Sequence, residues 1–207
     1  MSVSDPDISS LIRRAGEGDK SAVEHLLALH RERLRRMVMV YMDTRLVARV
    51  DPSDVVQDAL VEASQRLPDY LKERPLAFYP WLRQIAWQRL VHLQQHHLAQ
   101  KRSVLREHRG ELELSNESVV ALASRLVAQG SSPSEQAIRC ELRVRVGAAL
   151  DALSPKDRQV LVLRYLEQLS TAEAIQVIGI TEAAFVKRHM RAIKRLRQLL
   201  DREPEES

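Results

Sequence analysis

Apolar side chains recur at spacings of three and four residues along most of the chain, the pattern of helices with one buried face. No long run of β-branched residues alternates between turn signals, as strands would require. The sequence therefore predicts an all-α fold. The expected helices lie near residues 6–16, 20–47, 52–66, 76–99, 134–152, 155–166, 171–177 and 182–200.

Several of these helices begin with a short polar residue followed by proline. The polar side chain accepts N–H groups of the first turn, and proline is tolerated at the first helical position. Ser170 and Glu173 have the spacing of a capping box. The polar-proline pairs are Asp5-Pro6, Asp51-Pro52, Ser132-Pro133 and Ser154-Pro155.

The helical pattern weakens between residues 103 and 133, around Gly110 and Gly130. Polar runs surround an apolar stretch at 119–128 that is long enough for a short helix. The sequence thus predicts two small helical domains joined by a linker. The expected boundaries are 1–102 for the first domain, 103–133 for the linker and 134–207 for the second domain.

Composition narrows the class of protein. With 44% hydrophobic and 29% charged residues, the chain has the composition of a globular protein. A single cysteine, Cys140, allows no intramolecular disulfide. No segment resembles a signal peptide or a membrane span, so we expect a cytoplasmic protein without membrane contact.

The net charge of +4 is distributed unevenly. Residues 51–62 contain four acids and no base, residues 83–109 contain six bases and one acid, and residues 182–202 contain seven bases and two acids. The two basic regions suit a phosphate backbone, and the acidic region suits a basic protein surface.

The C-terminal basic region coincides with a helix-turn-helix pattern. A helix at 171–177 is followed by a turn through Gly179, and Thr181 precedes the next helix as its N-cap. Apolar residues of both helices can pack together and leave Glu182, Lys187, Arg188 and Arg191 to face a DNA major groove. The alternative is an αα-hairpin with a solvated basic face, but the excess of bases favours DNA.

The acidic segment 51–66 also predicts an amphipathic helix. Asp54, Gln57, Asp58 and Glu62 are expected on its outer face. Asp54 could simply stabilise the helix N-terminus through its interaction with the helix dipole, but that role does not explain Asp58 or Glu62. A contact with a basic surface of another protein is the functional alternative for this face.

The segment 76–99 combines an apolar stripe with a polar face, and five of the chain's eight aromatic residues lie at 70–87. The majority of the rings are expected in the core, and Trp87, between the two faces, is the favoured candidate for stacking on an unpaired base. His92 and His96 have metal-ligand spacing, but no carboxylate or cysteine completes a set nearby. Since no catalytic or phosphate-loop motif occurs either, we expect no metal, no cofactor and no enzymatic activity. The expected stripe consists of Trp81, Leu82, Ile85, Ala86, Leu90 and Leu93.

Taken together, the chain resembles a bacterial sigma factor of the extracytoplasmic-function (ECF) group of the sigma-70 family. DPSDVVQDALVEA resembles region 2.2, FYPWLRQIAWQRLVHL resembles regions 2.3 and 2.4, and the stretch from LSPKDRQVLVLRYLEQLS to the last helix resembles region 4. The resemblance implies a subunit that binds core RNA polymerase and directs promoter recognition, DNA melting and transcription initiation. Its partners would be core polymerase, promoter DNA and an anti-sigma factor or another regulator.

The resemblance also implies roles for individual residues. The segment 51–66 would bind the coiled-coil clamp of the largest polymerase subunit, the segment 76–102 the minus-10 element, and the last helix the minus-35 element. Residue by residue, the resemblance covers Asp54, Gln57 and Asp58 for core binding, Arg89, His92, Gln95 and His96 for the minus-10 element, and Lys187, Arg188, Arg191 and Lys194 for the minus-35 element. The expected sets also include Glu62 for core binding, Trp87, Gln88 and Arg102 for the minus-10 element, and Thr181, Glu182 and Arg195 for the minus-35 element.

This chain departs from the family at positions that matter for DNA sequence. Trp87-Gln88 stands where many ECF proteins have Arg-Asn, His92 where a later Asp is common, and Val186 where a lysine is frequent. Promoter preferences of relatives therefore do not transfer to it. The alternative function is a stand-alone helix-turn-helix regulator, which would bind a duplex operator without polymerase.

Overall fold

The computed structural model describes residues 5–47, 49–99, 122 and 136–201. These residues form helices and no strand, which confirms the all-α prediction. The chain divides into two compact units, Met1–Leu105 and Arg106–Ser207, called unit 1 and unit 2 below. Apart from Leu122, the predicted linker lies outside the described residues.

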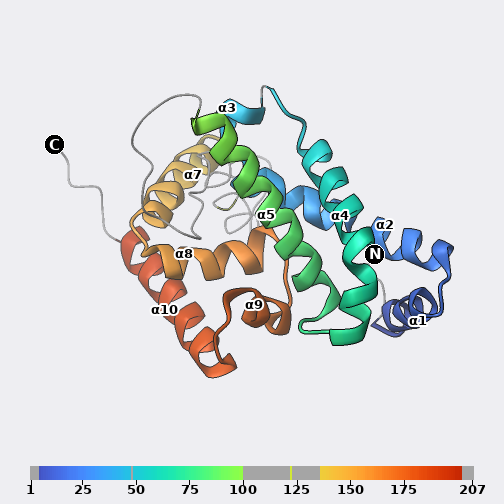
Figure 1. Cartoon of the computed structure of the whole chain (residues 1–207). Helices are drawn as coiled ribbons and strands as arrows, with labels where there is room; N and C mark the ends of the chain where they lie inside the picture. The colour runs from blue at the N-terminus through green and yellow to red at the C-terminus, as the bar shows by residue number, and fades with distance from the viewer. Residues whose placement is uncertain (1–4, 48, 100–121, 123–135, 202–207) are drawn as a thin grey trace. The chain divides into compact units, whose positions relative to one another are not determined.

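Unit 1 is a helical bundle (Figure 1). α4 packs against both α5 and α2, and α1 packs against α2. Its helices are α1 (Asp5–Gly16), α2 (Lys20–Tyr41), α3 (Thr44–Val47), α4 (Pro52–Glu73) and α5 (Phe78–Ala99).

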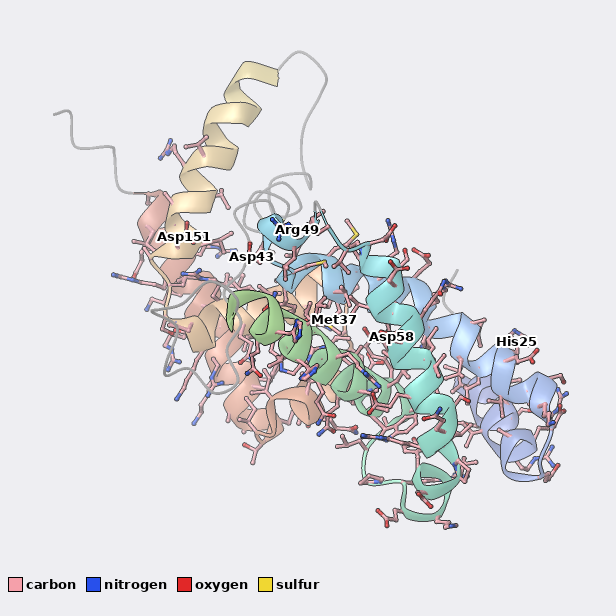
Figure 2. All side chains as sticks on the ribbon, turned by 45° about the horizontal axis from the view of Figure 1, so that its top comes forward. His25, Met37, Asp43, Arg49, Asp58 and Asp151 are labelled. Atoms are coloured by element: carbon pink, nitrogen blue, oxygen red, sulfur yellow. The ribbon has the colours of Figure 1, made fainter. Side chains whose placement is uncertain are left out.

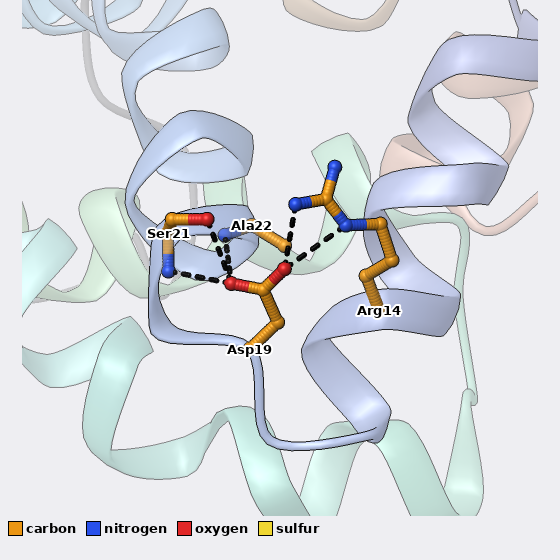
Figure 3. Close-up of polar contacts among 4 residues, drawn as sticks. All are labelled: Arg14, Asp19, Ser21 and Ala22. Carbon is orange, nitrogen blue, oxygen red and sulfur yellow. Dashed lines mark hydrogen bonds and ion pairs between the residues drawn. The ribbon is translucent and has the colours of Figure 1, made fainter.

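The start of α2 shows how polar side chains define the helix ends (Figure 3). The Asp19 carboxylate accepts hydrogen bonds from the backbone N–H groups of Ser21, at 2.9 Å, and Ala22, at 3.2 Å. Its other oxygen accepts two bonds from Arg14. The hydrogen bonds from Ser21 and Arg14 hold the pKa of this carboxyl well below its usual range.

The helix predicted at 20–47 is two helices, so that boundary was wrong. α2 ends at Tyr41, and the buried residue Met42 has an extended backbone with φ −73° and ψ 127°. Its N–H still bonds to the carbonyl oxygen of Val38. The chain leaves the helix at Met42 and then forms the short helix α3.

The helix predicted at 52–66 was too short, because α4 continues through Pro68 to Glu73. Proline inside a helix removes one backbone hydrogen bond and normally favours a break. Here the additional turns place Leu67 and Tyr70 in the core. The helix ends at Arg74, whose φ of 42° lies in the left-handed region.

The apolar stripe of α5 faces the core of unit 1, as predicted for four of its six residues. Leu82, Ile85, Ala86 and Leu90 are buried, whereas Trp81 and Leu93 are only partly covered. The Trp81 ring stacks on that of Tyr70, with centroids 4.3 Å apart. Trp81 thus covers the edge of the core.

Unit 2 is built around its C-terminal helix. α10 packs against α8, α7 and α9. The sequence predicted one α-helix at 155–166, but the second part of this segment is a π-helical turn. In it the Glu167 N–H donates a hydrogen bond to the Val162 carbonyl oxygen at 3.0 Å. The elements are α7 (Gln136–Asp151), α8 (Pro155–Leu161), η2 (Val162–Leu166), α9 (Thr171–Ile178) and α10 (Glu182–Leu200).

None of the helices in the described part of the chain is both long and apolar enough to cross a membrane.

Candidate functional site

The first candidate surface lies on α4. Asp54, Gln57 and Asp58 are exposed and are called the acidic face below. Figure 2 labels Asp58 on this helix. The opposite side of the helix, with Val55, Val56, Ala59 and Ala63, is buried in unit 1. The core therefore fixes the direction in which the acidic face points.

Glu62 does not belong to the acidic face, and its expected availability at the surface was wrong. Only 14% of its side chain is exposed. Its carboxylate pairs with Arg66, at 2.6 Å, and with Nε of Arg89 on α5. Two turns below Asp54, the helical rotation directs residue 62 toward α5 rather than toward solvent. The outward position is taken by Val61, which is 59% exposed and which the sequence analysis did not select.

The second candidate surface is the polar side of α5. Gln88, His92, Gln95 and His96 are exposed there, and 44% of the Arg89 side chain is exposed beside Glu62. Arg102, the remaining residue of the expected minus-10 set, lies outside the described residues.

Trp87 lies at the border of this polar side and is partly exposed. Its ring meets the Tyr41 ring edge-on, with centroids 4.9 Å apart. The Arg83 guanidinium lies 5.4 Å from the Trp87 ring centre and is itself buried. The Trp87 ring is thus held on one side and accessible on another.

Two buried polar residues of α5 were missed by the sequence analysis. Arg83 contacts the rings of Tyr41 and Trp87, and the Gln94 amide donates a 2.9 Å hydrogen bond to the Tyr41 carbonyl oxygen. Both tie α5 to the end of α2. Periodicity could not identify them, because polar residues are normally assigned to the outer face.

The third candidate surface is the helix-turn-helix of unit 2, formed by α9 and α10. The Ser170 and Glu173 capping box is present, with both reciprocal hydrogen bonds. Gly179 ends α9 with φ 73°, a conformation that glycine adopts without strain. Thr181 caps α10 by accepting the Ala184 N–H at 3.3 Å.

α10 has an inner and an outer side. Phe185, Ala192 and Leu196 are buried in unit 2. Arg188 is only partly exposed, so it lies toward the flank of the helix rather than at the centre of its outer side. The other expected minus-35 residues, Thr181, Glu182, Lys187, Arg191, Lys194 and Arg195, are exposed.

Arg191 is held in place by Asp157 of α8. Its Nε donates to both carboxylate oxygens, at 3.2 and 3.1 Å, and its Nη2 donates to Oδ1 at 2.6 Å. The Arg191 side chain is 64% exposed and that of Asp157 only 10%. The hydrogen bonds from Arg191 lower the pKa of the Asp157 carboxyl. Arg191 is therefore a positioned cation with donors left for a ligand.

An open groove of about 450 Å³ adjoins this ion pair. Lys194 and Arg195 add positive charge along it. Its lining consists of Ala152, Ser154, Asp157, Arg191, Lys194, Arg195 and Gln198.

His189 is turned inward and serves packing. Its ring stacks on Tyr165, with centroids 5.9 Å apart, and is parallel to Phe185 at 6.4 Å. Burial lowers the pKa of His189, so its neutral form is favoured in the folded protein. Among the residues whose side chains are described, no group of three or more His, Cys, Asp or Glu could hold a metal ion.

The chain is similar to known proteins of one family. Residues 143–196 match the model of sigma-70 region 4. The RNA polymerase sigma factor CnrH of Cupriavidus metallidurans is 29% identical over 94% of this chain and 95% of its own length. The ECF RNA polymerase sigma factor SigW of Bacillus subtilis is 22% identical over 93% of this chain and 96% of its own length.

A third relative is longer. The probable RNA polymerase sigma factor RfaY of Xanthomonas campestris is 33% identical over 150 residues, which are 72% of this chain but 34% of that protein. Among solved structures, CnrH in complex with the cytosolic domain of CnrY aligns with a TM-score of 0.53 and 26% identity, covering 94% of this chain and 97% of CnrH.

These relatives define the class as bacterial RNA polymerase sigma factors, regulatory subunits that direct promoter-specific initiation of transcription. The chain belongs to the ECF group of the sigma-70 family. The alternative of a stand-alone regulator finds no support among the comparisons.

Proposed function

We propose that this sigma factor binds core RNA polymerase through the acidic face of α4 and promoter DNA through α5 and α10. The observation that carries the proposal is the separation of exposed charge, with acidic side chains on α4 and basic side chains on α10. Asp54 and Asp58 are exposed on α4, whereas the outer side of α10 carries Lys187 and Lys194. Carboxylates suit a basic protein surface, and ammonium groups suit DNA phosphates.

The acidic face is assigned to the clamp coiled coil of the largest polymerase subunit. Because its residues are exposed and the reverse side of α4 is buried, a partner can dock there without unfolding unit 1. Glu62 is removed from this interface and assigned to the internal contact with Arg89.

The polar side of α5 is assigned to the minus-10 element. Gln88, Arg89 and His92 offer hydrogen-bond donors, and Trp87 offers a partly exposed ring on which an unpaired base can stack. This combination suits a single strand released by melting better than an intact duplex.

The outer side of α10 is assigned to the major groove of the minus-35 element, with Arg191 held by Asp157 for a phosphate or base contact. Two weak DNA contacts on separate units become effective when polymerase fixes their spacing. We therefore expect the free protein to bind DNA poorly and the holoenzyme to bind promoters tightly. Action on the polymerase places the protein in the cytoplasm.

A test of the core interface is co-purification of the full chain with core polymerase. Asp54→Asn combined with Asp58→Asn should weaken the association, because both substitutions remove charge from exposed positions. Asp69→Asn is the matched control, since Asp69 is also exposed on α4 but outside the acidic face. Equal recovery of polymerase with the double variant and the control would defeat the assignment.

Regulation by a sequestering protein is part of the proposal. CnrH, which covers nearly the whole chain, was solved with the cytosolic domain of CnrY bound. We extend this to an anti-sigma partner that covers one or more of the three surfaces until transcription is required.

A further inference from the structure

The outer side of α10 carries two exposed apolar side chains among its cations. Val186 is 44% exposed and Met190 is 66% exposed. Being four residues apart on one helix, they are neighbours on the surface. Since Phe185 and Ala192 provide the packing on the inner side, the two exposed side chains add little to the core of unit 2.

The charged residues around Val186 and Met190 indicate which kind of partner can bind there. Lys187 and Lys194 are exposed on the same helix, and Arg191 is fixed by its hydrogen bonds to Asp157. A small apolar area among cations matches the major groove of DNA, which has phosphates along its edges and an apolar group on its floor. That group is the C5 methyl of thymine, which no other base carries.

We propose that Val186 and Met190 determine specificity in the minus-35 element by contacting thymine methyl groups. The inference rests on the proposed entry of α10 into the major groove. Lysine and arginine then set position through phosphates and base acceptors, whereas the apolar pair selects A·T pairs over G·C pairs. Glu182, near the capped end of the helix, can accept a hydrogen bond but cannot recognise a methyl group.

The test replaces each thymine of the minus-35 element, one at a time, by deoxyuridine. This removes only the methyl group and preserves base pairing and hydrogen bonding. The probe is a promoter duplex mapped by transcription with the holoenzyme, and binding is measured by competition against the unmodified duplex. We expect at least one position where uracil weakens holoenzyme binding about fourfold, the effect of exposing one buried methyl.

Two variants make the test specific. Val186→Ala combined with Met190→Ala should bind the thymine and uracil duplexes equally. Val144→Ala is the control, because Val144 is 68% exposed on α7, outside the helix-turn-helix, and it should keep the fourfold preference.

The outcomes separate this inference from the proposed function. Promoter-specific binding without any thymine preference, or a preference that survives in the double variant, overturns the inference and leaves the function intact. A minus-35 element without A·T pairs also overturns it. If the double variant kept the thymine preference but no longer bound a partner protein, Val186 and Met190 would serve protein binding and the inference would be overturned. Absence of any sigma-dependent promoter binding overturns both.

Discussion

The ion pair between Glu62 and Arg89 connects the helix of the acidic face with the helix assigned to the minus-10 element. Only 14% of the Glu62 side chain and 44% of the Arg89 side chain are exposed. Exposed ion pairs contribute about 0.2–1 kcal/mol, and incomplete exposure favours the upper part of that range. Arg66 shares the same carboxylate and remains after Arg89 is changed. We therefore expect a coupling free energy of about 0.5–1 kcal/mol.

A double-mutant cycle measures this coupling. Glu62→Gln, Arg89→Gln and the double variant are unfolded with urea while tryptophan fluorescence is followed. The chain has two tryptophans, and both Trp81 and Trp87 lie on α5, so the signal reports on unit 1 alone. A parallel cycle on Arg13 and Glu17, whose side chains are 68% and 60% exposed, should give about 0.3 kcal/mol.

The same variants separate packing from polymerase binding. Glu62→Gln should bind core polymerase as the unsubstituted chain does, because its carboxylate faces α5. Glu62 would instead belong to the interface if Glu62→Gln weakened core binding, as the Asp54→Asn and Asp58→Asn double variant is expected to do, and if the coupling free energy with Arg89 were near zero.

Three further predictions concern unit 2. Asp157→Asn should reduce the loss of stability on acidification. Because Arg191 lowers the pKa of Asp157, this carboxylate stabilises the folded protein above the usual carboxyl range, and the stabilisation disappears as the pH falls through the folded pKa. Thermal unfolding at several pH values, followed by circular dichroism, checks this. Stability should also rise as the pH increases through the usual histidine range, because burial lowers the pKa of His189 in the folded protein, so that the unfolded chain binds this proton more tightly. His189→Phe should flatten this part of the profile. Ser170→Ala should cost about 1 kcal/mol in urea unfolding by removing the cap of α9, and an unchanged midpoint would contradict the capping role.

The sequence predicted the parts of the fold that local chemistry determines. Polar-proline starts at Asp51 and Ser154 are the observed N-caps, and the Ser170 box and the Gly179 turn are present. The end of α2 at Tyr41 and the passage of α4 through Pro68 depend on tertiary packing, which outweighs local preference at both places. Neither could be read from periodicity.

The candidate surfaces were predicted in outline, with errors where a side chain lies on the border of a face. Asp54 and Asp58 are exposed as expected, but Glu62 pairs with Arg89 across two helices, a contact between residues 27 positions apart. Arg191 was expected on a DNA-facing side, and its partner Asp157 could not be inferred because the two lie 34 positions apart. Val186 was noted only as a departure from the family and Met190 was not selected, because the expected DNA-facing side of the last helix was defined by its polar and charged residues.

Run-off transcription shows whether the protein directs initiation. It is carried out with purified core polymerase, with and without this protein, on pooled fragments from upstream of genes in its own genome. We expect new start sites that share a two-part upstream motif and that require the protein. The Asp54→Asn and Asp58→Asn double variant should lose these starts, whereas Asp69→Asn should keep them. If the protein instead retards duplex DNA by itself and produces no new start with core polymerase, it is not a sigma factor.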